Sequence, residues 1–295
     1  EYTKTLSNLN AIFGNTNNWT DTFTDLPKYD ALGNEIKYTL SEEATGSIFY
    51  TEENTVINQE NGIIINTFEV PDDTIEVPVM KIWNDGNNKA QKRPESVTVK
   101  LTGNGNTYEQ TLTSANVMSG NTNYWTYTFI DLPKYDALGN EIEYILSEEP
   151  TESIFYTEEN TVIDQETKTI TNTFEVPSDT VEVPVTKIWE DNSNEAEKRP
   201  ESISIKVTGN GETYTQEINA SNVEKDNANH WTYTFKNLPK YDENGDEIEY
   251  TIDEENVKSE FYQKTNIDQE ERTITNTFQV PGDTVTVIGI KEWID

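Results

Sequence analysis

A sequence repeat of about 106 residues is the feature that most limits what this chain can fold into. Trp19, Trp125 and Trp231 mark the repeat, and each lies 106 residues after the one before it. Solenoids and propellers are built from units of roughly 20–50 residues, so this period is too long for them. It predicts tandem domains, each with its own hydrophobic core.

The domain limits follow from where the repeat starts and stops. Two acidic segments, 69–79 and 175–185, carry prolines near each end, so we expect extended and fairly stiff joints there. The predicted organisation is a partial domain without its first strands, two complete domains, and the first strand of a further domain. Their limits are 1–70, 76–177, 182–281 and 285–295, respectively.

Within a repeat the local signals predict β-strands. The segments SVTVKL, YWTYTF, EIEYIL and KTITNTF alternate apolar and polar residues or are rich in β-branched and aromatic residues. Polar turn sequences such as GNGN, DALGN and DENGD separate them. No segment sustains the 3.6-residue period of an amphipathic helix. About seven short strands per 100 residues predict an all-β fold of tandem β-sandwich domains.

Composition excludes several classes of function. The chain has 55 acidic and 21 basic residues, a formal net charge of −34, which argues against nucleic acid or an anionic membrane surface as a partner. No run approaches the roughly 18 apolar residues of a membrane span, so we expect no membrane insertion. There are no cysteines, so disulfides cannot stabilise these domains.

Strand alternation places three polar residues of the middle repeat on apolar faces, because residues i and i+2 point the same way. Lys81 shares a face with Val79 and Trp83. Asn172 and Glu148 fall on the apolar faces of two other predicted strands. Burying an isolated charge costs several kcal/mol, so such a set calls for a specific role.

The set recurs along the chain. The third repeat supplies its own lysine, asparagine and glutamate, the first repeat keeps only a glutamate and an asparagine, and the trailing segment has only a lysine. These residues are Lys187, Asn276 and Glu254, then Glu42 and Asn66, and finally Lys291.

Two interpretations fit this set. In the first, the lysine and glutamate form a buried ion pair and the asparagine is hydrogen-bonded. In the second, the residues react. Desolvation favours the neutral amine, a nucleophile, and the asparagine carboxamide is the electrophile. A desolvated glutamic acid would hydrogen-bond the amide oxygen and transfer protons as ammonia leaves. The product would be a Lys–Asn isopeptide bond.

The whole chain resembles the Cna protein B-type repeat domains of adhesins and pilins on Gram-positive bacteria. The resemblance is carried by VPVTKIWEDN, KRPESISIKV, HWTYTFKNLPKYDENGDEIEYTIDEE and TITNTF. It implies an inverse-immunoglobulin, prealbumin-like β-sandwich, in many members with an intramolecular isopeptide bond. By position it assigns Lys81–Asn172 and Lys187–Asn276 as cross-linked pairs, with Glu148 and Glu254 as catalytic. Glu42 is expected to be the catalytic glutamate of the partial first repeat. The trailing segment departs from the pattern at Ile288, where the other repeats have proline.

These observations lead to two functional hypotheses. The first is a structural stalk of an extracellular, cell-wall-attached adhesin or pilus-like fibre, whose partners are further repeats of a longer chain and a host or matrix ligand bound by a separate head domain. The second is an adhesive module whose repeats contact the ligand directly. Turnover catalysis is disfavoured because lysine and asparagine would be consumed once. We expect no cofactor and no metal, although the loops WNDGNN and WEDNSN contain oxygen ligands that suit calcium.

Overall fold

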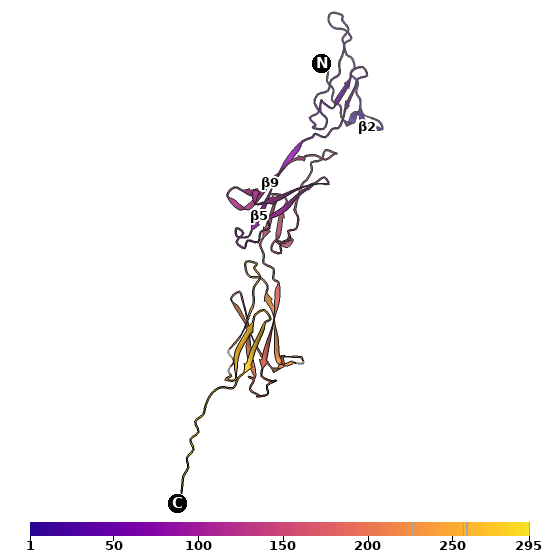
Figure 1. Ribbon diagram of the computed structural model, residues 1–295. Helices are drawn as coiled ribbons and strands as arrows, with labels where there is room; N and C mark the ends of the chain where they lie inside the picture. The colour runs from indigo at the N-terminus through magenta and orange to yellow at the C-terminus, as the bar shows by residue number, and fades with distance from the viewer. Residues whose placement is uncertain (226, 256, 258, 295) are drawn as a thin grey trace. The chain divides into compact units, whose positions relative to one another are not determined.

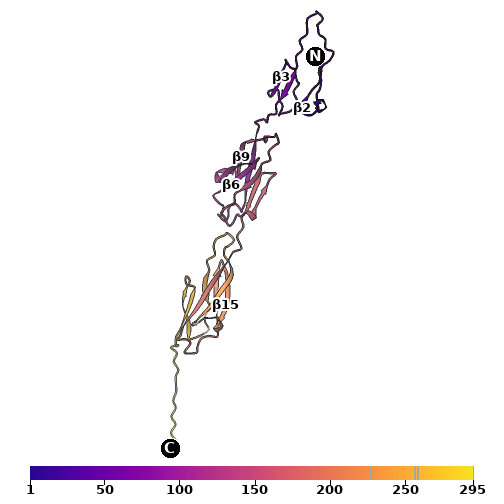
Figure 2. The ribbon, with the colours of Figure 1, turned by 90° about the vertical axis from the view of Figure 1, so that its right-hand side faces the viewer.

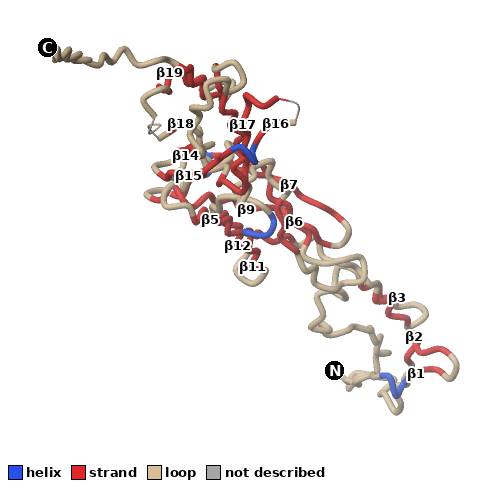
Figure 3. The backbone as a smooth tube through the Cα atoms, turned by 90° about the horizontal axis from the view of Figure 1, so that it is seen from below, coloured by secondary structure: helices blue, strands red, loops and turns tan. Residues whose placement is uncertain are grey.

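Strands and turns make up nearly all of the regular structure (Figure 3). The computed structural model describes residues 1–225, 227–255, 257 and 259–294. Helical structure in these residues is limited to short 3-10 turns, none of which is long and apolar enough to cross a membrane. The turns are η1 (Asn8–Asn10), η2 (Ser114–Asn116), η3 (Glu158–Asn160) and η4 (Ala220–Asn222). The predicted all-β fold is confirmed.

The described residues separate into two compact units. The first comprises Glu1–Asp73 and Pro133–Ile142, and the second Thr74–Leu132 and Glu143–Asp295. The first unit has two short hairpins and, among its described residues, no buried side chain. Its strands are β1 (Ala11–Ile12) paired with β2 (Asn15–Trp19), and β3 (Thr55–Asn58) paired with β4 (Ile63–Asn66).

In the second unit, residues of the middle repeat form a β-sandwich (Figure 1). One sheet has the order β11-β12-β5-β9-β8 and the other β10-β6-β7. The five-stranded sheet consists of β5 (Thr74–Asn84), β8 (Val117–Met118), β9 (Asn121–Pro133), β11 (Thr161–Asp164) and β12 (Thr169–Thr173). The three-stranded sheet consists of β6 (Ser96–Gly103), β7 (Asn106–Thr113) and β10 (Ile145–Glu148).

The third repeat forms a second β-sandwich of the same topology (Figure 2). Its sheets have the orders β16-β17-β13-β20-β19 and β15-β14-β18. The five-stranded sheet contains β13 (Thr180–Glu190), β16 (Val223–Glu224), β17 (Asn227–Pro239), β19 (Tyr262–Asp268) and β20 (Thr273–Phe278). The three-stranded sheet contains β14 (Ser202–Gly209), β15 (Glu212–Asn219) and β18 (Thr251–Glu254).

The first and last strands of each sandwich are parallel neighbours. β12 pairs with β5 and β20 pairs with β13, whereas the other pairings that the structure describes in the two sandwiches are antiparallel. A parallel pair cannot be joined by a tight turn. The intervening strands therefore form the rest of the sandwich before the chain returns to lie beside its own first strand.

The alternation of apolar and polar residues along the strands explains which side chains form the core of each sandwich. Along β6, every second residue, including Val97, Val99 and Leu101, is buried between the sheets. The β6–β7 hairpin turns at Asn104 and Gly105, whose φ angles of 48° and 76° suit the primed turn that joins antiparallel strands.

Two expectations about the ends of the repeats differ from the structure. The joint 69–79 is not wholly a linker, because β5 begins at Thr74, and β13 likewise begins at Thr180 within 175–185. The alternating residues Ile75 and Val77 bring this acidic stretch into the sheet. No strand forms over residues 285–294, since a segment without a hydrogen-bonding neighbour cannot form a ladder.

The core packing generates one stability prediction. Leu101 is fully buried, so Leu101→Ala should destabilise the middle sandwich by about 2–5 kcal/mol through lost burial and a residual cavity. The matched control Leu138→Ala removes a side chain that is 78% exposed and should change stability little. Hydrogen exchange of the β6 amides at increasing urea concentration would measure the stability change in each variant. Equal effects of the two variants would contradict the assigned core.

Candidate cross-linking site

The lysine and asparagine predicted from strand parity lie on adjacent parallel strands of each sandwich. In the middle sandwich Lys81 of β5 is in register with Ile170, and Asn172 of β12 with Trp83. In the third, Lys187 of β13 is in register with Ile274 of β20, two residues before Asn276. A lysine side chain is long enough to reach such a diagonal neighbour on the same face.

The glutamate comes from the opposite sheet. Glu148 is the last residue of β10, and its side chain is 5% exposed. Its carboxylate lies between the other two groups: Oε2 is 3.1 Å from Lys81 Nζ, and Oε1 accepts a hydrogen bond of 2.7 Å from Asn172 Nδ2. The three groups therefore meet in the core, between the sheets.

The third sandwich assembles the same groups with longer contacts. Asn276 Nδ2 donates to Glu254 Oε1 at 3.4 Å, and Lys187 Nζ lies 4.0 Å from the same oxygen. The Lys187 amine also donates to the backbone carbonyls of Ile188 at 3.2 Å and Ile274 at 3.5 Å. The structure thus brings together all six residues that parity and resemblance selected.

These polar groups are removed from solvent. Lys81, Asn172, Lys187 and Asn276 are each 0% exposed. The Oδ1 atoms of both asparagines are buried without a hydrogen-bond donor among the described residues. Amide oxygen and nitrogen are interchangeable by a flip of the side chain. That flip would turn the amide oxygen toward the glutamate carboxyl group.

Burial changes the acid–base behaviour of the lysines. Desolvation lowers the pKa of Lys81 to about 8, against the opposing effect of the Glu148 charge. Desolvation also lowers the pKa of Lys187, against Glu254 and with a further lowering from the nearby positive charge of Arg199. Both amines therefore release a proton far more readily than a solvated lysine.

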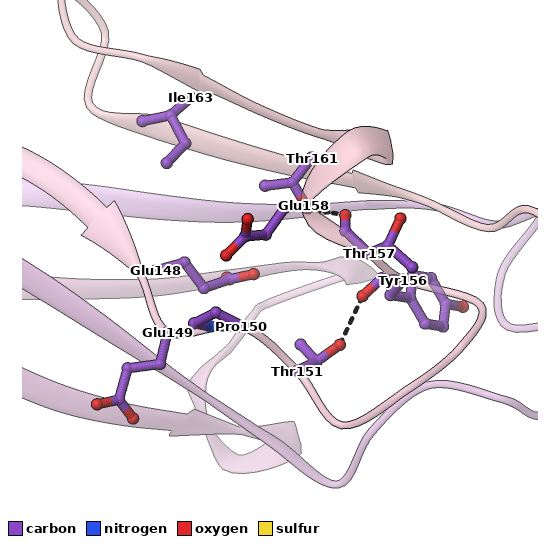
Figure 4. Close-up of a pocket in the computed structure, with 9 residues that line it drawn as sticks. All are labelled: Glu148, Glu149, Pro150, Thr151, Tyr156, Thr157, Glu158, Thr161 and Ile163. Carbon is purple, nitrogen blue, oxygen red and sulfur yellow. Dashed lines mark hydrogen bonds between the residues drawn. The ribbon is translucent and has the colours of Figure 1, made fainter.

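A cavity of about 250 Å³ reaches the middle site from the surface (Figure 4). Glu148 lies on its wall together with residues that follow β10 and residues around η3, including Thr151, Tyr156 and Glu158. The Thr151 hydroxyl donates to the Tyr156 carbonyl at 2.6 Å across this opening. The cavity thus borders the site at Glu148, whose side chain is 5% exposed.

The other predicted residues lie outside the buried sites. Asn66 of β4 donates to Glu42 at 3.2 Å, so this asparagine–glutamate pair forms, but both side chains are exposed. Lys291 is exposed in the strand-free segment, with its amine 3.4 Å from the ring centroid of Trp293. Neither place has a lysine, an asparagine and a glutamate together.

Parity missed a second buried polar cluster in each sandwich. In the middle one, Arg93 forms an ion pair with Asp85, and the Tyr156 hydroxyl donates to the same carboxylate at 3.0 Å. The third sandwich repeats this cluster with Arg199, Asp191 and Tyr262. The recurrent sequences WND/WED and KRPES carried the signal, because they hold the aspartate and arginine at a constant spacing.

The calcium hypothesis for the loops after β5 and β13 receives no support from this geometry. Their aspartates, Asp85 and Asp191, are each bound by an arginine rather than left free as ligands. Within the described part of the chain, no three His, Cys, Asp or Glu side chains are grouped so as to hold a metal ion.

Comparisons with protein families and with known proteins identify the kind of domain that this chain contains. The sequence model of the Cna protein B-type domain matches residues 3–67, 77–173 and 183–277. A collagen adhesin of Staphylococcus aureus is 33% identical over 278 residues, which is 94% of this chain and 21% of that protein. The chain thus spans about one fifth of the length of this relative.

Two solved structures are also similar. The crystal structure of two B repeat units of the Staphylococcus aureus collagen-binding protein is 33% identical, with a TM-score of 0.43, covering 88% of this chain and 62% of that one. A single B repeat unit of that protein is 31% identical, with a TM-score of 0.29, covering 70% of this chain and all of that one.

The lowered lysine pKa predicts a pH dependence of stability. The variant Asn172→Ala keeps Lys81 buried but cannot react. Its unfolded state holds the Lys81 proton up to about pH 10.5, whereas the folded state loses it near pH 8. The free energy of unfolding of the middle sandwich should therefore rise by up to about 3 kcal/mol as the pH increases from 8 to 10.5. Below pH 8 it should stay at its lower value.

Urea unfolding at a series of pH values would measure this rise. The double variant Asn172→Ala/Lys81→Met serves as the control, because it retains every other titrating group. The difference between the two variants isolates Lys81, and a difference that does not change between pH 8 and pH 10.5 would contradict the lowered pKa.

Proposed function

Because the chain belongs to the family of Cna protein B-type domains, we propose that it is a structural stalk segment of a bacterial surface adhesin or pilus-like fibre, stabilised by intramolecular isopeptide bonds. One bond would join Lys81 to Asn172 and the other Lys187 to Asn276. The repeats 76–177 and 182–281 would be the cross-linked domains.

The proposed reaction follows from the contacts. The neutral Lys81 amine attacks the carboxamide carbon of Asn172, forming a new C–N bond. Glu148 takes the proton that the Lys81 ammonium gives up and, carrying it, donates a hydrogen bond to the amide oxygen as negative charge develops there. It then carries a proton from the attacking nitrogen to the departing one, so ammonia leaves and an amide remains. Glu254 has the same role for Lys187 and Asn276.

The observation that carries this proposal is the recurrence of one buried arrangement in two sandwiches. Each has lysine and asparagine on parallel neighbours in the same register, and a glutamate from the opposite sheet between them. A buried ion pair with a hydrogen-bonded asparagine would also explain the contacts among these three residues. It would not explain why the asparagine amide oxygen is buried without a donor.

The cavity beside Glu148 supports the same chemistry, because the reaction releases ammonia from a closed core. Of the three residues Lys81, Asn172 and Glu148, Glu148 is the one that lines this opening. Ammonia leaving Asn172 would pass Glu148 on its way to solvent.

The cross-link would suit a load-bearing stalk. It would tie the first strand of a sandwich to the last, closing a loop of about 90 residues. By analogy with a disulfide of that span, loop closure would stabilise the fold by roughly 4–5 kcal/mol. Force applied through the chain termini enters at these two strands, so a covalent bond between them carries the load past the rest of the sandwich.

The place of action and the partners are part of the proposal. The matched relative is a collagen adhesin, and this chain corresponds to about one fifth of its length. We propose an extracellular position on the cell surface, with further repeats as neighbours and the ligand bound elsewhere in the longer protein. Lys291 and the pair Asn66–Glu42 would belong to further cross-linking sets of the array.

The competing function is a module whose own repeats bind a matrix ligand. The exposed Ile130 and Val162 would be available for such contacts. Immobilised collagen and other matrix proteins, probed with this chain alone, separate the two functions. Saturable binding would favour the module, and no binding would favour the stalk.

Mass spectrometry under denaturing conditions tests the cross-links. The folded chain should weigh two ammonia molecules less than its sequence predicts, and peptide mapping should find Lys81 joined to Asn172 and Lys187 to Asn276. An unshifted mass in the mature folded protein would refute the reaction.

The variant Glu148→Ala tests the catalytic assignment. It should recover the mass of one ammonia while Lys187–Asn276 still closes in the same molecule, because the two sites use separate carboxylates. Glu149→Ala is the matched control: its side chain lies next in sequence, is half exposed and faces away from the site, so both bonds should form. Loss of closure in both variants would contradict the role of Glu148.

Single-molecule stretching tests the mechanical consequence. With both bonds formed, the 89–91 residues between the linked residues of each sandwich should add no length to the chain under load. Glu148→Ala should add one unfolding event, whose length gain matches the middle sandwich. An identical force–extension record for the two proteins would contradict the proposed load path.

A further inference from the structure

Each candidate lysine shares a buried tryptophan ring with an arginine. In the middle sandwich, Lys81 Nζ lies 4.6 Å and Arg93 Cζ 5.4 Å from the ring centroid of Trp83. In the third, Lys187 and Arg199 lie 4.2 Å and 5.5 Å from the centroid of Trp189. The two rings are 2% and 1% exposed. In each sandwich one tryptophan ring therefore contacts both the reactive amine and the arginine.

All three nitrogen atoms of the guanidinium group donate hydrogen bonds, which hold the arginine in place. Arg199 Nε and Nη2 each donate to the Asp191 carboxylate at 2.5 Å. Nη1 donates to the Ala228 carbonyl at 2.8 Å, and Nη2 also donates to Asn229 at 2.6 Å. Arg93 makes the corresponding bonds to Asp85, the Thr122 carbonyl and Asn123.

The aspartate that binds the arginine also binds a tyrosine, and this tyrosine contacts the same tryptophan ring. Asp191 accepts a hydrogen bond of 2.8 Å from Tyr262, whose ring meets Trp189 edge-on at 5.1 Å between centroids. Burial would raise the pKa of Asp191, but the hydrogen bonds from Arg199 and Tyr262 outweigh it and lower the pKa overall. The arginine, the aspartate and the tyrosine thus form one clamp around the ring.

We propose that Arg93 and Arg199 are positioning residues for the cross-linking reaction: each holds a tryptophan ring against the reactive lysine, which keeps water from the amine and places a fixed positive charge near it. This inference rests on the proposed function. The arginines do not touch the lysine or asparagine atoms that react, so they act through the ring and through their charge.

The charged groups around Lys187 define the expected electrostatic effect. Glu254 faces it from β18, and Asp191 and Arg199 from the loop that follows β13. The two carboxylates favour the ammonium form, and Arg199 together with burial favours the neutral amine. Removing Arg199 eliminates a charge that opposes protonation, admits water beside Trp189 and leaves Asp191 uncompensated. All three changes make the free amine rarer at neutral pH.

The experiment follows bond closure during refolding. The full chain is recovered unfolded in urea before closure, diluted into buffers between pH 5 and pH 9, stopped with acid at timed intervals, and mapped by mass spectrometry. Arg199→Gln is compared with the unaltered chain, and Lys81–Asn172 closure in the same molecule is the internal control. Near-ultraviolet circular dichroism of the aromatic residues reports whether the third sandwich refolds.

For Arg199→Gln we expect closure of Lys187–Asn276 to slow by about tenfold at neutral pH, the effect of one pKa unit on the fraction of free amine. The rate should recover toward higher pH, while closure at Lys81 is unchanged. Arg199→Lys keeps the charge but cannot form the planar two-point bond to Asp191, so it should restore only part of the rate.

Two results would overturn the inference. One is closure of Arg199→Gln at the unaltered rate and pH dependence. The other is slowing by the same factor at every pH, which indicates a loosened fold rather than a changed amine. If Arg199→Gln does not refold, Asn229→Ala removes one acceptor of the clamp and should shift the pH dependence in the same direction by less. Absence of ammonia loss in the unaltered chain would instead refute the proposed function itself.

Discussion

The buried contact among an amine, a carboxylate and a carboxamide is the interaction on which the rest of each sandwich depends. Lys81 and Asn172 are fully buried, and an isolated charge there would cost several kcal/mol. The fold meets this cost by bringing Glu148 from the opposite sheet to within contact of both. In the proposed reaction, the same burial that makes the amine costly to protonate would make it a nucleophile.

The surrounding fold is arranged to hold that contact. The parallel pairing of first and last strands sets the diagonal spacing of lysine and asparagine. In the third sandwich, Lys187, Arg199 and Tyr262 all contact the ring of Trp189. A chain without cysteine cannot use disulfides to join its strands. In the proposed stalk, a bond made from lysine and asparagine fills that role.

Strand alternation predicted a large part of this from sequence. Because side chains alternate strictly along a strand, a lysine at the parity of Val79 and Trp83 had to face the core. The all-β class and the repeat could also be predicted from the sequence. The role of Arg93 could not, because this residue lies in a loop, where no alternation pattern shows which way a side chain points. The strand expected at 285–295 does not form over 285–294, the part of it that the structure describes, since strand propensity alone supplies no hydrogen-bonding partner.

The sequence by itself determined that Lys81, Asn172 and their counterparts Lys187 and Asn276 face the apolar sides of their strands, since periodicity is local and needs no knowledge of the fold. The tertiary structure decided which of them meet. Nothing local could show that Glu148 crosses from the other sheet, that Lys81 and Asn172 lie two register positions apart, or that Arg93 lies over the ring that Lys81 contacts. Those distances are set by strand order and register, which arise only when segments far apart in the chain pair.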